Sequence, residues 1–193
     1  AYFQAVGSGT GAIAAWENAE RLAADGRFGE NKMRIYASQN APFTIMYDSW
    51  KAHSRELVPM TPEEGRQKAE VILGKVLSNR KPPYSLAGGL FDVLEKSGGD
   101  MFKVSNDEIV SWVVKYFSLE GYDLFPASAC AVSSLKQALD AGIVKHDETV
   151  MLNVTGGGML GATRKGFILK EPDLILSPDL PAEEIIAAVD KLF

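Results

Sequence analysis

The sequence contains few of the residues that mark several classes of protein. Cys130 is its only cysteine, so no disulfide can form within the chain, and we expect a reducing, cytoplasmic location. Its two histidines, His53 and His146, have no second histidine or cysteine at metal-site spacing, so we predict no metal. No apolar run approaches the ~18 residues of a membrane-spanning helix, which predicts that no membrane is a partner.

An excess of positive charge is also missing. The chain has 20 lysines and arginines against 25 acidic residues, which gives a net charge of -5. A protein that binds a nucleic-acid backbone needs a basic surface, so we predict no nucleic-acid partner. With 193 residues, 46% of them hydrophobic and 23% charged, the chain is expected to fold around a sizeable core as one large domain or one and a half.

Strand-like and helix-like patterns alternate along the chain. We expect strands at residues 2–6, 33–37, 101–104, 122–125 and 149–154, and helices at residues 12–25, 42–51, 62–77, 86–96, 106–117, 126–142 and 181–192. Two of these helices begin with capping boxes, Thr61 with Glu64 and Ser105 with Glu108. The alternation predicts an α/β fold, a three-layer parallel sheet with helices on both faces.

The first candidate site is a glycine-rich loop between the first predicted strand and the first helix. It consists of Gly7, Ser8, Gly9, Thr10 and Gly11. Successive backbone N–H groups at a helix N-terminus converge on an anion, and the helix dipole favours its negative charge. The loop therefore predicts a phosphate site, against the alternative of an ordinary tight turn.

The kind of phosphate ligand is open at this point. Gly7, Gly9 and Ala12 match the G-x-G-x-x-A fingerprint of dinucleotide-binding proteins, so a nicotinamide-dependent oxidoreductase is one alternative. That fingerprint requires an acidic residue after the second strand, which here ends in Ser38, Gln39 and Asn40. The lack of an acid favours a ligand with a single phosphate. The three polar residues are themselves candidate substrate contacts.

A second glycine-rich loop follows the last predicted strand. It runs through Asn153, Val154 and Thr155 into three glycines at residues 156–158. The carboxyl ends of parallel strands meet at one edge of a sheet, so both glycine loops are expected at the same edge. A hydroxyl beside glycines suits a planar ligand that lies close to the backbone, although a turn without a ligand is an equal alternative.

Several segments together resemble the fold-type-II pyridoxal-phosphate enzymes of the tryptophan synthase β family. Within that family they are most similar to the branch of threonine synthases and archaeal cysteate synthases. The similar segments are residues 5–13, 35–42, 97–99 with the cap at 105, 119–121, 126–129 and 153–156.

The resemblance implies a cofactor, pyridoxal 5'-phosphate, and a role for each matching residue. Residues 7–11 would hold the cofactor phosphate, and the Thr155 hydroxyl would meet the pyridine nitrogen. The implied reaction is β-replacement on a small phosphorylated amino acid. For a cysteate synthase this is O-phosphoserine with sulfite, and for a threonine synthase, the alternative, it is O-phosphohomoserine with water. The family also implies a homo-oligomer, usually a dimer.

The chain departs from the family in one important respect. The family's Schiff-base lysine precedes the phosphate loop, and no lysine of this sequence occupies a matching position. We therefore expect residues 1–193 to be the C-terminal large-domain portion of the enzyme, with the N-terminal lysine-bearing region absent. On this interpretation the chain contains no catalytic residue and is inactive alone. A non-catalytic phosphate-binding module is a further alternative.

Overall fold

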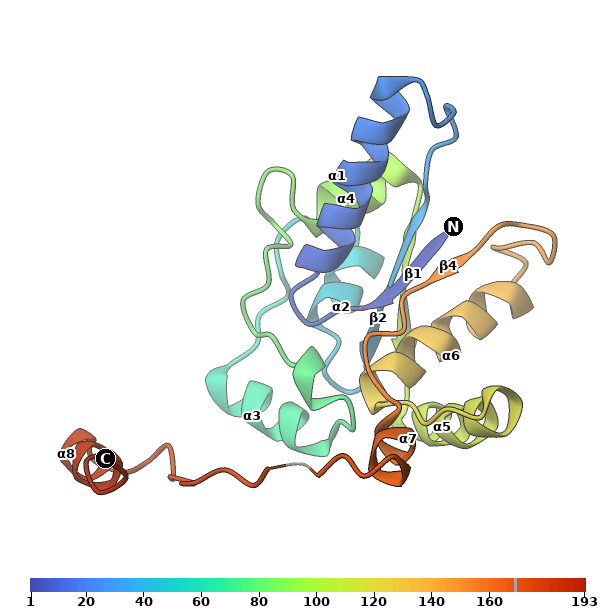
Figure 1. Cartoon of the computed structure of the whole chain (residues 1–193). Helices are drawn as coiled ribbons and strands as arrows, with labels where there is room; N and C mark the ends of the chain where they lie inside the picture. Colours follow the sequence, from blue (N-terminus) through green and yellow to red (C-terminus); the bar gives the residue numbers. More distant parts are fainter. Residues whose placement is uncertain (169) are drawn as a thin grey trace. The chain divides into compact units, whose positions relative to one another are not determined.

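The computed structural model describes residues 1–168 and 170–193, and it divides the chain into two units, Ala1–Leu160 and Gly161–Phe193. The elements in chain order are β1 (Tyr2–Ala5), α1 (Thr10–Asp25), β2 (Ile35–Asn40), α2 (Ile45–Lys51), α3 (Pro62–Val71), the 3-10 helix η1 (Lys75–Leu77), α4 (Leu90–Ser97), β3 (Asp100–Val104), α5 (Asn106–Glu120), α6 (Pro126–Asp140), β4 (Met151–Leu152), α7 (Met159–Arg164) and α8 (Ala182–Val189) (Figure 1).

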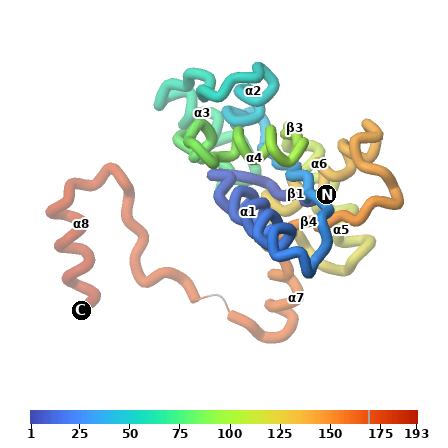
Figure 2. The backbone as a smooth tube through the Cα atoms, turned by 90° about the horizontal axis from the view of Figure 1, so that it is seen from above, coloured from blue at the N-terminus to red at the C-terminus, as the bar shows by residue number. Residues whose placement is uncertain are grey.

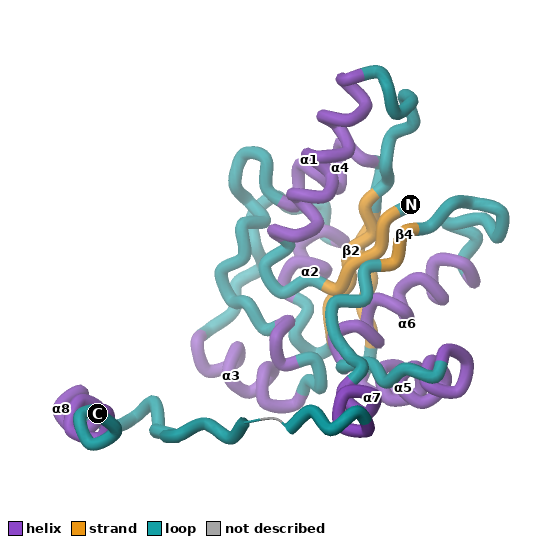
Figure 3. Tube along the Cα trace, viewed as in Figure 1, coloured by secondary structure: helices purple, strands orange, loops and turns teal. Residues whose placement is uncertain are grey.

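The first unit is built around a parallel sheet of four strands in the order β3-β2-β1-β4. In the register, Phe3 pairs with Tyr36 on one side and with Leu152 on the other. All strands run the same way, so their carboxyl ends share one edge. The loops after β1 and β4 both begin at this edge (Figure 3).

Helices cover both faces of the sheet, which confirms the predicted three-layer α/β fold. On one face, buried residues of α1, α2 and α4 form a core with Ile35 and Ala37 of β2. On the other face, α6 packs its small residues against the sheet, where Phe3 stacks on Tyr36 with ring centroids 4.7 Å apart. Figure 2 shows the strands passing between α1 and α6.

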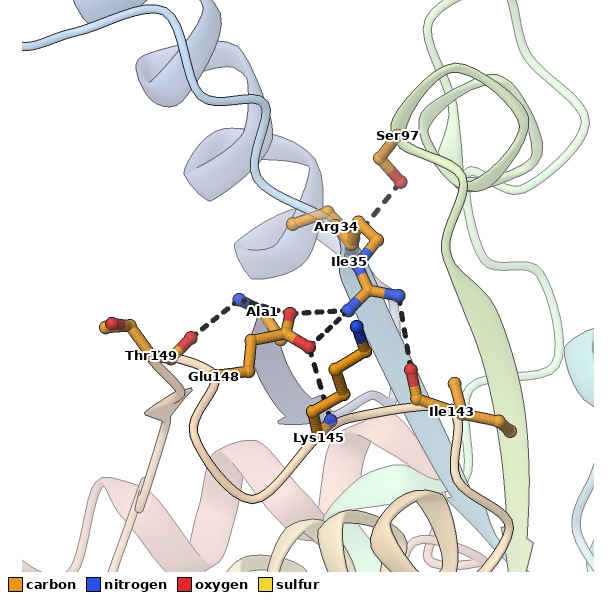
Figure 4. A network of polar contacts seen from close by, with 8 residues as sticks. All are labelled: Ala1, Arg34, Ile35, Ser97, Ile143, Lys145, Glu148 and Thr149. Carbon is orange, nitrogen blue, oxygen red and sulfur yellow. Dashed lines mark hydrogen bonds and ion pairs between the residues drawn. The ribbon is translucent and has the colours of Figure 1, made fainter.

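A polar cluster fixes the amino edge of the sheet, opposite the glycine loops (Figure 4). Arg34, just before β2, forms an ion pair with Glu148 and donates to the Ile143 carbonyl at 3.3 Å. The backbone nitrogen of Ala1 donates to the Thr149 carbonyl at 2.9 Å. The Arg34 guanidinium lowers the pKa of the Glu148 carboxyl below its usual value, chiefly through their hydrogen bond.

Several predicted segments differ from the structure, among them the second strand, which spans Ile35–Asn40 instead of residues 33–37. The helix predicted to reach residue 77 ends at Val71, because the next backbone N–H groups bind asparagine side chains instead of continuing the helix. The helix predicted from residue 86 begins at Leu90, after a tight turn through Gly88 at a φ of 74°. Residues 122–125 make only an isolated bridge at Leu124, and β4 pairs only two residues with β1.

The second unit contains α8, which begins after Pro181 and has two acidic residues in its first turn, as suits the positive end of a helix dipole. Within the described parts of the chain, no helix has the length and apolar character needed to cross a bilayer.

Candidate functional site

The first glycine loop joins β1 directly to α1. Gly9 is the N-cap of α1 and has a φ of 84°, a left-handed conformation that glycine adopts without strain. No side chain caps this helix, and its first turn contains no acidic residue. The positive end of the helix dipole therefore faces the loop uncompensated, which suits an anionic group. The hydroxyls of Ser8 and Thr10 lie 2.9 Å apart at the same place.

Close packing explains why glycine occupies the ends of this loop. A Cβ at Gly7 would lie 2.6 Å from the Val76 carbonyl oxygen, and a Cβ at Gly11 would lie 2.6 Å from the side chain of Gln4. Both distances are shorter than side-chain contacts allow. The loop is therefore held between η1 and the strand below it, with its N–H groups at the carboxyl edge of the sheet.

The second loop is fixed mainly by residues outside the sheet. Ser128, fully buried at the start of α6, accepts from the Gly156 N–H at 2.9 Å and donates to the Gly156 carbonyl at 2.8 Å. Its hydroxyl lies 3.5 Å from that of Thr155. Asp123 accepts from the N–H groups of Met159 and Leu160 at the start of α7. These contacts hold the exposed Thr155 hydroxyl in place beside Gly156.

A chain of polar side chains connects the two loops. Tyr2 donates its phenol proton to Gln4 Oε1 at 2.8 Å and accepts from Asn153 Nδ2 at 2.9 Å. Gln4 lies beneath Gly11 of the first loop, and Asn153 begins the second. Burial raises the pKa of Tyr2 and the Asn153 hydrogen bond opposes that effect, so the phenol stays protonated near neutral pH.

An open hollow of about 410 Å³ lies at this edge. Its wall includes Thr155 and Gly156 of the second loop, the start of α6 at Pro126, and the segment from Leu73 to Val76. Val76 is also the residue whose carbonyl contacts Gly7. The hollow therefore lies between the Thr155 loop and the segment that supports the first glycine loop.

The three polar residues at the end of β2 are fully buried and have partners within the protein. Ser38 Oγ lies 3.7 Å from Cys130 Sγ. Gln39 Oε1 accepts from the N–H groups of Met46 and Tyr47 and so caps α2, whereas its Nε2 has no partner among the described residues. The predicted substrate role of Ser38, Gln39 and Asn40 remains a prediction.

Asn40 helps to fix the wall of the hollow. Its Oδ1 accepts from the Gly74 N–H at 2.9 Å, and its Nδ2 lies 3.1 Å from Oδ1 of Asn106. Asn106 in turn accepts from the Leu73 N–H at 3.1 Å and donates to the Val71 carbonyl at 2.7 Å. Two asparagines from different elements thus determine the path of residues 71–74.

Sequence reasoning did not identify Ser128 and Asn106 as parts of the site. Ser128 lies in the segment 126–129 that supported the family resemblance, which is the one signal that could have singled it out. Asn106 follows the cap at Ser105, where a polar residue has an ordinary local explanation. Their role depends on contacts across 28 and 33 residues, which no local pattern reveals.

The residues present fit a planar phosphate ester. The first loop offers N–H groups, hydroxyls and the end of a helix dipole, which suit the phosphate. The second offers a neutral hydroxyl beside Gly156, where a Cβ would lie 2.8 Å from Phe125. Within the described residues, no group of three or more His, Cys, Asp or Glu side chains is placed to hold a metal ion.

Comparisons with known proteins agree with this geometry. A cysteate synthase of Methanosarcina acetivorans is 42% identical to this chain over 187 residues, which are 95% of this chain and 45% of that protein. A cysteate synthase of Methanoculleus marisnigri is 48% identical over 159 residues, 82% of this chain and 37% of that protein. The chain thus spans less than half the length of these curated relatives.

The solved structures and the family comparison lead to the same fold. The structure of maize serine racemase matches with a TM-score of 0.50 and 14% identity, over 86% of this chain and 47% of that one, and it supports the fold alone. The family described as pyridoxal-phosphate dependent enzyme (PALP) matches residues 1–156, which include the first glycine loop and Thr155. The chain therefore belongs to the pyridoxal-phosphate dependent enzyme family.

Proposed function

We propose that this chain is the cofactor-holding large-domain portion of a cysteate synthase, which converts O-phosphoserine and sulfite into cysteate and phosphate. The observation that carries the choice of activity is the 42–48% identity to cysteate synthases over 82–95% of this chain. Threonine synthase, acting on O-phosphohomoserine, is the alternative within the same family. Family membership and the lack of an acid after β2 favour pyridoxal phosphate over a nicotinamide dinucleotide.

In this proposal residues 7–11 bind the cofactor phosphate. The N–H groups at the start of α1 donate to its oxygens, and Ser8 and Thr10 add hydroxyl donors. The first turn of α1 has no carboxylate that would repel the phosphate. The phosphate then fixes the position of the cofactor relative to the sheet edge.

Thr155 is proposed to meet the pyridine nitrogen. When bound, pyridoxal phosphate supplies an electron sink for reactions at the amino acid's α-carbon. A neutral hydroxyl holds less positive charge on the ring nitrogen than an aspartate does, so we expect β-elimination and replacement to be favoured over transamination. Ser128 keeps the Thr155 loop in position through Gly156. Ser38, Gln39 and Asn40 are proposed to act at the same edge, Asn40 by fixing Gly74.

The covalent attachment to a lysine belongs, in this proposal, to the part of the enzyme that the relatives contain beyond the matched 45%. A homodimer in the cytoplasm with a small phosphorylated amino acid as substrate completes the proposal. The 193-residue chain is accordingly expected to bind pyridoxal phosphate without turning over substrate.

Two experiments test the proposal. The first follows binding of pyridoxal 5'-phosphate to the 193-residue chain by ³¹P NMR, with Gly9→Ala as the variant, because a side chain at a φ of 84° is strained and meets Leu90 at 3.1 Å. Binding of NADH without binding of pyridoxal phosphate would contradict the proposed cofactor.

The second experiment assays the complete enzyme for phosphate release. We expect release from O-phosphoserine in the presence of sulfite, with cysteate as product. Release from O-phosphohomoserine alone would favour threonine synthase, and activity with neither substrate would exclude both. Thr155→Asp is expected to lower the rate of replacement, and an unchanged rate and product would refute the role given to the neutral hydroxyl.

A further inference from the structure

A second, larger hollow is lined in part by the residues that follow η1. It has a volume of about 680 Å³ and is lined by Met60, Pro62, Ser78, Asn79, Arg80 and Lys81. Arg80 and Lys81 are exposed, and within the described residues neither side chain has an ion-pair partner. Two uncompensated cations in one hollow are notable in a chain whose net charge is -5.

The two acidic residues that follow the lining residue Pro62 have other partners. Glu63 pairs with Arg66, and Glu64 accepts hydrogen bonds from the backbone and side chain of Thr61 as part of the capping box. Neither carboxylate is hydrogen-bonded or ion-paired to Arg80. Because neither Arg80 nor Lys81 forms an ion pair within the described residues, their charge is available to an external anion.

Packing holds the stem of Arg80 in place. A Cβ at Gly65 would lie 2.7 Å from Arg80 Cδ, so the aliphatic part of the arginine lies directly on α3 where that helix has no side chain. Gly65 is buried and costs α3 some helix propensity. An arginine whose stem is fixed loses less conformational entropy when its guanidinium binds a ligand.

The neighbouring residues add a neutral donor. Asn79 Oδ1 accepts from the Lys81 N–H at 2.9 Å, which leaves the Asn79 amide protons free to donate. Guanidinium, ammonium and amide donors together suit a small tetrahedral or pyramidal oxyanion better than a carboxylate, because they approach from several directions.

The position of this hollow connects it with the proposed active site. Val76 lines the first hollow and contacts Gly7, and Arg80 follows only four residues later. Four residues span at most about 14 Å between Cα atoms, and the arginine side chain shortens the gap to a ligand. The Arg80 hollow therefore borders the same stretch of chain that lines the hollow beside Thr155.

We propose that Ser78, Asn79, Arg80 and Lys81 form a binding site for a small, doubly charged oxyanion, with Arg80 as its main contact. Placing this oxyanion in the reaction rests on the proposed function: it is the phosphate group of the amino-acid substrate or the sulfite that replaces it. The site is separate from the loop of residues 7–11, which the cofactor phosphate occupies in the proposal.

The test is a titration of the ¹⁵N-labelled chain with inorganic phosphate at constant ionic strength, with chloride as the balancing salt. We expect saturable shifts of the amides of residues 78–81, distinct from those of residues 7–11. Arg80→Gln weakens the binding at 78–81 about tenfold, as expected for the loss of one charge-assisted contact. Arg66→Gln, which removes a neighbouring paired arginine, leaves it unchanged.

A second variant separates position from charge. Gly65→Ala keeps every charge and improves the helix propensity of α3, but it displaces the stem of Arg80. We expect weaker phosphate binding at 78–81 in a chain that is at least as resistant to urea. No shift at 78–81, or an equal effect of Arg66→Gln and Arg80→Gln, would overturn the proposal.

The source of the oxyanion follows from two further titrations. If O-phosphoserine competes with phosphate at residues 78–81 and serine does not, the site binds the leaving group. If sulfite alone competes, the site binds the incoming group. None of these measurements requires the cofactor. If the chain binds phosphate at residues 78–81 but does not bind pyridoxal phosphate, the proposed function is overturned and the oxyanion site stands. If it binds pyridoxal phosphate but no phosphate at residues 78–81, the oxyanion site is overturned and the proposed function stands.

Discussion

Ser128→Ala is the most direct test of how the Thr155 loop is held. The Ser128 hydroxyl is fully buried and is both acceptor and donor for the backbone of Gly156, at 2.9 and 2.8 Å. After the substitution, the Gly156 carbonyl keeps its bond from the Phe125 N–H at 3.1 Å, whereas the Gly156 N–H loses the partner that Ser128 supplied. An amide left without its partner costs about 1–3 kcal/mol, so we expect a loss of that size in the free energy of unfolding.

The same helix provides a matched control. Ser134 is also fully buried in α6, but its hydroxyl donates only to the Ala131 carbonyl of its own helix at 2.7 Å. Ser134→Ala removes a hydroxyl of the same size without leaving a distant backbone group unpaired, so its cost should stay below about 1 kcal/mol. Urea unfolding of both variants, followed by tryptophan fluorescence, gives the comparison.

A local measurement separates the role of Ser128 from general packing. Hydrogen exchange at the Gly156 amide should become roughly tenfold to a hundredfold faster in Ser128→Ala and stay unchanged in Ser134→Ala, since about 1.4 kcal/mol corresponds to a factor of ten. Equal costs for the two variants, or unchanged exchange at Gly156, would refute the inference that Ser128 fixes this loop.

Three further predictions concern residues outside that loop. Asn106→Ala should lower the free energy of unfolding by about 1–3 kcal/mol and make residues 71–74 sensitive to limited proteolysis. If residues 71–74 stay resistant to the protease, Asn106 does not hold this segment in place. Because Arg34 lowers the folded-state pKa of Glu148, that stabilisation is complete above the unfolded pKa of about 4.3 and is lost as the pH falls through the lower folded value. Glu148→Gln should therefore destabilise at pH 7, with a difference from the parent that shrinks in acid, and a constant difference would argue against the ion pair. Burial raises the pKa of the Cys130 thiol to about 12, so a disulfide reagent at pH 8 should modify it only after unfolding in urea, and rapid modification of the native chain would contradict its burial.

The general plan of the molecule follows from local patterns in the sequence. The capping boxes at Thr61 and Ser105 form as expected, and each begins its helix. The alternation of elements predicted a parallel sheet, which the structure contains. In such a sheet the loops after β1 and β4 must meet at one edge, so their proximity could be predicted without knowing any tertiary contact. The left-handed conformation of Gly9 at the N-cap of α1 likewise depends on the residue type at that position and not on distant contacts.

The remaining features depend on contacts that a single sequence does not reveal. The end of α3 at Val71 results from the asparagines of β2 and α5, whose side chains compete with the helix for the next N–H groups. The strand containing Ser38, Gln39 and Asn40 extends beyond its predicted end because buried partners satisfy all three polar side chains, apart from one nitrogen of Gln39. From the sequence these residues were candidate substrate contacts at the end of the strand, and their partners within the protein could not be foreseen.

The short pairing of β4 has a consequence for motion within the site. Only Met151 and Leu152 belong to the ladder, so the loop behind them depends for its rigidity on α6 and on Asp123. The first glycine loop, in contrast, continues directly from a strand that is paired on both sides. The first loop is therefore fixed by the sheet and the second by α6 and Asp123, so the affinity of a ligand that contacts both loops should depend on the packing of α6 as well as on the strand.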